Sequence, residues 1–240
     1  MLSVARVEHK FFIHAADVKR LTSCLDTIMM RDPHCVSRPS YKISSLYFDT
    51  EYDDDLAEKL DGVRYREKYR VRIYDDNVEL GKFEVKRKIE NTILKKSIVL
   101  NGNQIAETYK KNYKFLLEND QLAYVYGRMK YKNYAPRSIV SYDRTAFTLP
   151  YDNIRITLDM NMRSHGHVDA LGLKIASSRA VRIVPKDYQI LEVKYQNELP
   201  TFIGKILTEY QLSKTAISKY SASRLHSSRE LNGDEPYFSF

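Results

Sequence analysis

An alternation of charged and apolar residues between positions 64 and 88 restricts the fold of this chain more than any other stretch. Successive side chains of a β-strand point to opposite faces, so residues of one parity share a face. In the first half of the stretch one face is wholly cationic and the other is mostly aromatic or aliphatic. The cationic residues are Arg64, Arg66, Lys68, Arg70 and Arg72. The pattern predicts a β-hairpin with a turn at 75–77 and a second basic strand that ends at Lys88.

Two interpretations of this cationic face are open. It is either the solvated outer face of an antiparallel sheet, which is the common case, or an inward face that holds a polyanion. Like charges along one face repel each other and lower the stability of the fold unless an anion neutralises them. An ordinary outer face would carry both signs of charge. We therefore favour the interpretation in which the face binds a polyanion.

The overall charge also indicates an anionic partner. The chain has 240 residues, with 39 Lys and Arg against 31 Asp and Glu, and a formal net charge of +8. Nucleic acid, a membrane surface and small polyphosphates would all fit this charge. The sequence shows no signal peptide at Met1 and no long apolar run, so we expect a cytoplasmic protein without a membrane span.

The same alternation recurs along the chain and predicts eight strands. They are expected at residues 5–13, 41–50, 64–74, 78–88, 93–100, 137–149, 154–160 and 188–195. Eight strands can close a small barrel. If the charged faces point inward, the apolar faces need a cover, which amphipathic helices expected at 15–30, 105–129 and 199–210 would supply. The predicted fold is α+β: an eight-stranded antiparallel β tunnel barrel with a polar, basic interior, flanked by α-helices.

We expect one domain over residues 1–226, because no linker or internal repeat interrupts the chain. A polar C-terminal tail over residues 227–240 should be flexible. Within the domain, the inward faces would gather many cations and few carboxylates. The cations are Lys10, Arg64, Arg66, Lys68, Arg70, Arg72, Lys86, Lys88, Arg144, Arg155 and Lys194, and the carboxylates are Glu8, Glu84, Asp159 and Glu192.

This set of side chains suits a phosphate chain together with a divalent metal ion. Arginine binds phosphate oxygens through a planar fork, and lysine binds them as a point charge. Magnesium is typically held by one or two carboxylates and by the phosphates of the substrate. Each carboxylate alone could equally form a structural ion pair with a neighbouring cation, so both roles stay open for it.

Eight short motifs, in their order, resemble those of the VTC (vacuolar transporter chaperone) domain family of polyphosphate polymerases, in the triphosphate tunnel metalloenzyme (CYTH-like) superfamily. The motifs are Arg6-Val7-Glu8-His9-Lys10-Phe11, Ser45-Leu46-Tyr47-Phe48-Asp49-Thr50, Lys68-Tyr69-Arg70-Val71-Arg72, Glu84-Val85-Lys86-Arg87-Lys88, Ser141-Tyr142-Asp143-Arg144-Thr145-Ala146-Phe147, Arg155-Ile156-Thr157-Leu158-Asp159, Leu191-Glu192-Val193-Lys194-Tyr195 and Ser218-Lys219-Tyr220. No single motif decides the match, which rests on their number and order. The resemblance implies an eight-stranded tunnel barrel, in agreement with the alternation of faces.

The resemblance also implies a reaction and assigns residues to it. Polymerases of this family transfer the γ-phosphate of ATP to a growing inorganic polyphosphate chain and release ADP. The catalytic residues would be Arg70, Arg72, Arg144 and Lys219. Binding of the phosphate chain would fall to Lys10, Lys86, Lys88, Lys96, Tyr142, Arg155, Lys194 and Ser218, with Lys95 as the alternative to Lys96. Glu192 matches the family's metal-binding glutamate, with Mn²⁺ or Mg²⁺ as the expected ion, and Glu8, Glu84 and Asp159 are further candidates for binding the metal or for positioning water.

Three functions remain open at this point: the polymerase, a metal-dependent inorganic or nucleoside triphosphatase, and a non-catalytic module that binds polyphosphate or nucleic acid. Hydrolytic members of the superfamily begin with Glu-x-Glu-x-Lys, whereas this chain has Arg6 at the first position. The loss of one carboxylate weakens a two-metal site and the activation of water, which favours transfer to a phosphate acceptor.

The ligands we expect are ATP and polyphosphate, and we expect no nucleic acid. Proteins that bind single-stranded nucleic acid place aromatic side chains beside exposed cations, whereas here the two kinds mostly lie on opposite faces. Larger relatives of the family carry membrane spans and a phosphate-sensing domain, neither of which this sequence shows. Regulation and export of the product would then need a separate, membrane-bound partner.

Overall fold

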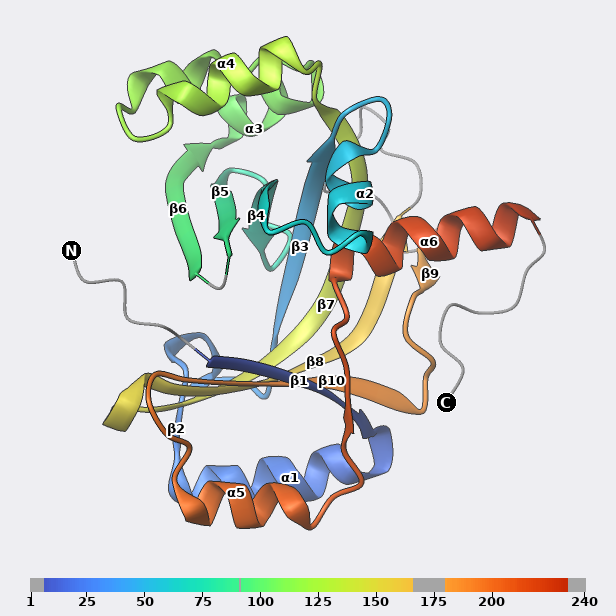
Figure 1. Cartoon of the computed structure of the whole chain (residues 1–240). Helices are drawn as coiled ribbons and strands as arrows, with labels where there is room; N and C mark the ends of the chain where they lie inside the picture. Colours follow the sequence, from blue (N-terminus) through green and yellow to red (C-terminus); the bar gives the residue numbers. More distant parts are fainter. Residues whose placement is uncertain (1–6, 91, 166–179, 233–240) are drawn as a thin grey trace.

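The structure, a computed structural model, describes residues 7–90, 92–165 and 180–232, with side chains up to 226 (Figure 1). Arg6 and residues 233–240 therefore lie outside the described residues. The long strands are β1 (Val7–His14), β3 (Tyr41–Asp49), β4 (Tyr65–Tyr74), β5 (Leu80–Ile89), β6 (Thr92–Asn101), β7 (Ala135–Leu149), β8 (Ile154–His165) and β10 (Tyr188–Tyr195). They correspond to the eight strands that the alternation predicts.

All described strands belong to one antiparallel sheet, whose main order is β11-β1-β10-β8-β7-β3-β4-β5-β6. Three strands of two residues each were not predicted, because so short a segment carries no alternation: β2 (Met30–Arg31), β9 (Val181–Arg182) and β11 (Ser213–Lys214). The predicted turn of the central hairpin is confirmed. Asp75 and Asp76 form it with φ angles of 52° and 56°, a left-handed conformation that aspartate tolerates better than most residues.

The prediction of a closed eight-stranded barrel is not confirmed. The sheet has eleven strands in the described part of the chain, and β6 does not pair with β1, as closure would require. Part of the free edge of β1 is taken by β11, which pairs with Phe11 and Phe12. Side-chain alternation fixes which side of a strand is polar but not whether two distant edges meet, so the sequence pattern could not decide this point.

The open sheet is nevertheless strongly bent, so that its two halves face each other. Figure 1 shows β4, β5 and β6 standing over the layer that β1, β8 and β10 form, with β3 and β7 running between the two halves. An ion pair spans the space: Lys86 Nζ on β5 lies 3.8 Å from Glu8 Oε2 on β1. We call the side of the sheet that lines this space the inner face.

Helices cover both outer faces of the sheet, as predicted. One outer core packs β3, β4 and β5 under α3 (Gly102–Tyr109), the 3₁₀ turn η2 (Lys114–Glu118) and α4 (Ala123–Tyr131). The other packs β1, β8 and β10 against α1 (Ala15–Ile28) and α5 (Thr201–Thr208). The helix expected at 105–129 is thus three shorter segments. The first of them begins at a capping box, in which the side chains of Asn101 and Gln104 each accept from the other's backbone N–H.

A third core lies on the inner face itself and corrects the expectation of a wholly polar interior. Tyr47, Tyr142 and Ile190 come from the sheet, Ile217 comes from the segment that leads into α6 (Lys219–Asn232), and Tyr220 comes from the first turn of that helix. The helix therefore covers one end of the inner face, beside α2 (Asp54–Leu60) (Figure 1). The helix also continues to residue 232, past position 227 where we expected the flexible tail to begin.

Candidate functional site

The cations that alternation places on one side do lie on the inner face, except Arg64, which is exposed and precedes β4. In the hairpin, Lys68 is opposite Lys86, and Arg70 is opposite Glu84. In the other half of the sheet, Lys10 is opposite Glu192, and Lys194 is opposite Arg155. Since each of these residues has its apolar sequence neighbours in an outer core, the charged side chains can only point into the space between the two halves.

The upper half of the site is organised around one buried carboxylate, Glu84. Its Oε2 lies 2.6 Å from Arg70 Nε and 3.7 Å from Arg72 Nη1, and its Oε1 contacts Lys95 Nζ. Burial alone would raise the pKa of Glu84, but the charges of Arg70, Arg72 and Lys95 outweigh it and hold the pKa well below the usual range. The carboxylate is therefore ionised at neutral pH and keeps the two guanidinium groups in a fixed orientation.

The lower half is organised around Asp159 and Glu192. Arg144 forms a bidentate ion pair with Asp159, in which Nε donates to Oδ1 at 2.6 Å and Nη2 donates to Oδ2 at 2.7 Å. Lys219 Nζ lies 2.7 Å from Asp159 Oδ2 and 3.0 Å from Glu192 Oε1, so it bridges the two carboxylates. Burial would lower the pKa of Lys219, but these two carboxylates reverse the effect and raise it. The ammonium group thus stays charged although it is almost fully enclosed.

A third carboxylate, Glu8, ties the two halves together. Its oxygens lie 3.2 Å from Lys10 Nζ, 3.7 Å from Lys194 Nζ and 3.8 Å from Lys86 Nζ. Burial works toward a higher pKa of Glu8, but the lysines, Lys194 first, bring the pKa below its usual value. Lys10 and Lys194 also contact Glu192, at 3.8 and 2.9 Å. These contacts join three strands, β1, β5 and β10, in one network of ion pairs.

We call these ion-paired residues the charge cluster. Its cations are Lys10, Arg70, Arg72, Lys86, Lys95, Arg144, Lys194 and Lys219, and its carboxylates are Glu8, Glu84, Asp159 and Glu192. Eight positive groups face four negative ones across the inner face. Such a surplus of buried or half-buried charge is costly until an anion neutralises it, so the cluster is suited to a polyanion.

Three further predicted residues border the cluster. Tyr142 lies beneath it, with Lys219 Nζ 5.0 Å and the Arg144 guanidinium carbon 5.3 Å from its ring centre. Ser218 accepts from Lys68 Nζ at 3.2 Å. Lys88 lies farther along β5, opposite Arg66. Tyr142 and Lys88 lie on the inner face, as predicted, and Ser218 reaches it from the segment before α6.

Arg155 lies on the inner face but is directed to its end. Its Nη1 is 2.8 Å from Asp32 Oδ2, and its Nη2 donates to Tyr41 Oη at 3.4 Å. The sequence analysis did not single out Asp32, which no alternation marks because it lies in the loop that begins η1 (Pro33–Cys35). Tyr47 was also missed as a site residue, and it accepts from Arg70 Nη1 at 3.3 Å.

Lys96 lies on the outer face of the sheet, so the prediction that it contacts phosphate on the inner face is wrong. Its register partner on β5 is Val85, an outer-core residue, whereas the partner of Lys95 is Lys86. Lys96 Nζ donates to the backbone oxygen of Gln121 at 3.1 Å. The alternative residue, Lys95, reaches Glu84 and joins the cluster, because pairing with β5 decides which of two adjacent lysines turns inward.

Comparison with known protein families agrees with this geometry. The profile of the VTC domain family matches residues 5–227, which is most of the chain. This protein belongs to the VTC domain family. The match includes every residue of the charge cluster, and a search of curated proteins found no match.

Solved structures resemble this VTC domain only distantly. A provisionally assigned adenylate cyclase from Vibrio parahaemolyticus is 12% identical, covers 92% of this chain and 98% of its own, and has a TM-score of 0.47. Another, from Bacillus halodurans, is 13% identical, covers 98% and 95%, and has a TM-score of 0.42. At this level of sequence identity and TM-score, the similarity gives no information about the activity of this chain.

The carboxylates of the cluster fit a metal ion only if substrate supplies other ligands. Within the described residues, no three His, Cys, Asp or Glu side chains are arranged to hold a metal ion. Glu192 shares the cations Lys10 and Lys194 with Glu8, and the cations Lys219 and Arg144 with Asp159, so it can form a pair of carboxylates with either one. Two carboxylates are enough for an Mg²⁺ or Mn²⁺ ion that keeps phosphate oxygens in its coordination sphere.

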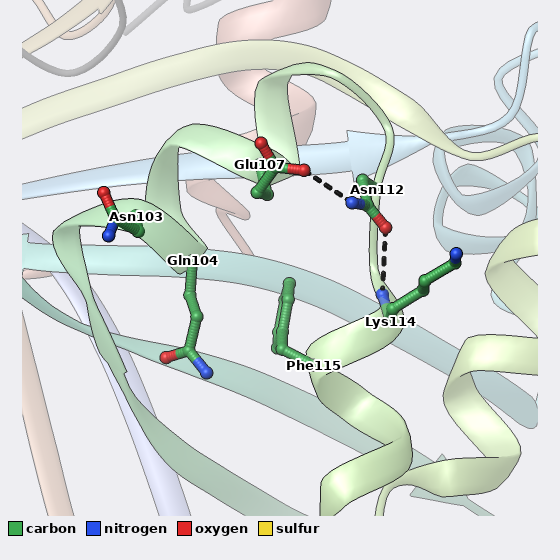
Figure 2. Close-up of a pocket in the computed structure, with 6 residues that line it drawn as sticks. All are labelled: Asn103, Gln104, Glu107, Asn112, Lys114 and Phe115. Atoms are coloured by element: carbon green, nitrogen blue, oxygen red, sulfur yellow. Dashed lines mark hydrogen bonds between the residues drawn. The ribbon is translucent and has the colours of Figure 1, made fainter.

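A small hollow of about 130 Å³ lies apart from the cluster, between α3 and η2 (Figure 2). Its lining residues are Asn103, Gln104, Glu107, Asn112, Lys114 and Phe115. Figure 2 shows that Asn112 joins Glu107 to the backbone of Lys114, so these polar groups already satisfy one another. The hollow has no surplus of cations and does not extend the site.

None of the helices that the structure describes combines the length and the apolar character that a membrane span requires.

The adjacent lysines of β6 give a matched pair of variants. We expect Lys95→Ala to weaken the binding of inorganic tripolyphosphate about tenfold, because it removes a charged contact from the inner face. Lys96→Ala should change the dissociation constant by less than about twofold, since Lys96 lies on the outer face. Isothermal titration calorimetry measures both. Equal effects of the two substitutions would contradict the register on which the site is built.

The pH dependence of binding should report on Lys68. Burial, with repulsion from Lys59, lowers the pKa of Lys68 to about 7. A polyanion favours the protonated form, so the contribution of Lys68 to affinity should be present below pH 7 and be lost as the pH rises toward 9. Lys68→Arg, which stays charged, is the control that cancels the ligand's own titration. We expect the ratio of wild-type to variant affinity to fall over this range. A constant ratio would refute the shifted pKa.

Proposed function

We propose that this protein is a polyphosphate polymerase, which transfers the γ-phosphate of ATP to the end of a growing inorganic polyphosphate chain and releases ADP. The observation that carries the proposal is the surplus of cations in the charge cluster, which lies between the two halves of one bent sheet. A solvated face would need no such enclosure. Membership of the VTC domain family supports the same assignment.

The side chains of the cluster suit phosphoryl transfer, which needs mainly positioning and stabilisation of charge. In this step the bond between the β,γ-bridging oxygen and the γ-phosphorus breaks, and a terminal oxygen of the chain forms the new bond to phosphorus. Arg70, Arg72 and Arg144 would bind the phosphoryl oxygens through guanidinium N–H groups other than those that hold Glu84 and Asp159, and Lys219 would neutralise charge beside them. Because Glu84 and Asp159 already hold these arginines, little reorganisation would accompany the reaction.

A divalent ion, Mn²⁺ or Mg²⁺, would be held by Glu192 and Glu8 together with the phosphates. When bound, it would supply further stabilisation of the charge on the phosphate oxygens. Lys10 and Lys194 contact both glutamates and would then be released to bind phosphate instead. The exchange of partners would couple metal binding to substrate binding.

Two alternatives receive less support from the site. A triphosphatase needs a group that activates water, but each carboxylate of the cluster has a lysine or arginine within 4 Å. A nucleic-acid module needs aromatic rings on which bases stack. Tyr47 and Tyr142 do lie among the cations, contrary to a strict segregation of the two kinds, but they are only 6% and 2% exposed. Neither ring offers a face to a base.

Product analysis tests the proposal and its alternatives together. We expect the purified protein, incubated with ATP and Mn²⁺, to give a ladder of long polyphosphate chains on a stained gel, with ADP and little free phosphate. Arg70→Ala should abolish the ladder, which would assign the activity to this chain. Free phosphate without chains would instead identify a triphosphatase. If neither product forms although polyphosphate binds tightly, the protein is a non-catalytic binding module.

A further inference from the structure

Two of the motifs that carry the resemblance contain residues to which it assigns no role. Two of these residues contact each other in the structure. Asp49 belongs to the motif at 45–50, and Tyr220 ends the motif Ser218-Lys219-Tyr220. Tyr220 Oη donates to Asp49 Oδ2 at 2.6 Å across 171 positions of sequence. Tyr220 is 2% exposed and Asp49 is fully buried. A buried hydrogen bond between these motifs suggests that they act together.

Asp49 is a rigid acceptor for this hydrogen bond. Its Oδ1 accepts from the backbone N–H groups of Thr50 and Asp55, at 2.8 and 2.9 Å, and its Oδ2 accepts from that of Leu56 at 3.0 Å. The carboxylate therefore caps the first turn of α2, where backbone N–H groups otherwise lack partners. With three backbone donors holding it, Asp49 cannot turn to follow a moving tyrosine.

Other contacts hold the rest of Tyr220 and its helix. The ring stacks on Tyr47, with 5.4 Å between ring centres. One turn later, Arg224 pairs with Asp53 through both arms of its fork, at 2.7 and 2.8 Å, and also donates to Tyr220 Oη at 3.3 Å. The start of α6 is thus attached to the start of α2 at two points.

The position of Lys219 depends on this attachment, because Lys219 directly precedes Tyr220. Consecutive side chains of an α-helix leave the axis about 100° apart, so fixing the direction of one fixes that of the next. The Lys219 ammonium group has little tolerance for rotation, since it bridges Asp159 and Glu192 at 2.7 and 3.0 Å. A small rotation of the first turn would break one of these two contacts.

We propose that Tyr220 is a positioning residue, whose hydrogen bond to Asp49 fixes the first turn of α6 and thereby holds Lys219 at the phosphate-binding face. The inference rests on the proposed function only in so far as Lys219 binds phosphate. It does not need the polymerase reaction. It therefore remains testable by binding measurements even if the protein makes no polyphosphate chains.

A double-mutant cycle with Tyr220→Phe and Lys219→Met tests the proposal. The phenylalanine keeps the stacking on Tyr47 and removes only the hydroxyl group. We expect Tyr220→Phe to raise the dissociation constant for inorganic tripolyphosphate about two- to tenfold, the range for one hydrogen bond. In the Lys219→Met background the same substitution should have almost no effect, because it acts through Lys219. Equal effects in both backgrounds would overturn the proposal.

A matched control separates positioning from stability. Tyr134 is equally buried and donates to Asp55 of the same helix α2 at 2.7 Å, but it lies in the outer core under α4. Tyr134→Phe should lower the melting temperature about as much as Tyr220→Phe and leave tripolyphosphate binding unchanged. If both tyrosine variants weaken binding alike, the effect of Tyr220 is only structural and the proposal fails.

A second measurement serves if Lys219→Met does not fold. Acetylation of lysines in the folded protein, followed by mass spectrometry, reports how enclosed each amine is. We expect Lys219 to react slowly in the wild type and in Tyr134→Phe, and several-fold faster in Tyr220→Phe. An unchanged rate at Lys219 would overturn the proposal. If the double-mutant cycle shows that Tyr220 acts through Lys219 but the product assay gives no polyphosphate chains, this inference holds and the polymerase proposal is rejected.

Discussion

The charge surplus on the inner face is the constraint on which the rest of this structure depends. Eight cations gather where water is partly excluded, and four carboxylates neutralise only part of their charge. Glu84 and Asp159, both almost fully buried, offset the cost by binding the arginines directly. The same contacts that offset the positive charge also fix the guanidinium groups in place. Stability and readiness to bind phosphate therefore have one physical origin.

The architecture follows from turning this face inward. The opposite face of every long strand must then bury its apolar residues outside the sheet, and α1, α5, α3 and α4 provide the cover. Where the inner face itself becomes apolar, around Tyr142 and Ile190, α6 closes over it and brings Lys219 into the cluster. A helix that seals one end of the space thus also delivers one of its functional side chains.

Alternation in the sequence predicts much of this arrangement, because the period of a strand determines which side chains share a face. The strands, their inward cations and the helical cover all follow from it. Pairing between distant strands does not, so closure of the barrel was wrongly expected and Lys96 was chosen over Lys95. The contact between Asp49 and Tyr220 was equally out of reach, since only the folded chain brings those positions together.

The most direct test of the central claim is a lysine footprint with and without inorganic tripolyphosphate. If the inner face binds the phosphate chain, the ligand should slow acetylation of Lys68, Lys86 and Lys95. Lys96 on the outer face and the exposed Lys110 on α3's C-terminal side should react at unchanged rates. Protection spread equally over inner and outer lysines would contradict the account, because the polyanion would then be held by net charge alone and not by this site.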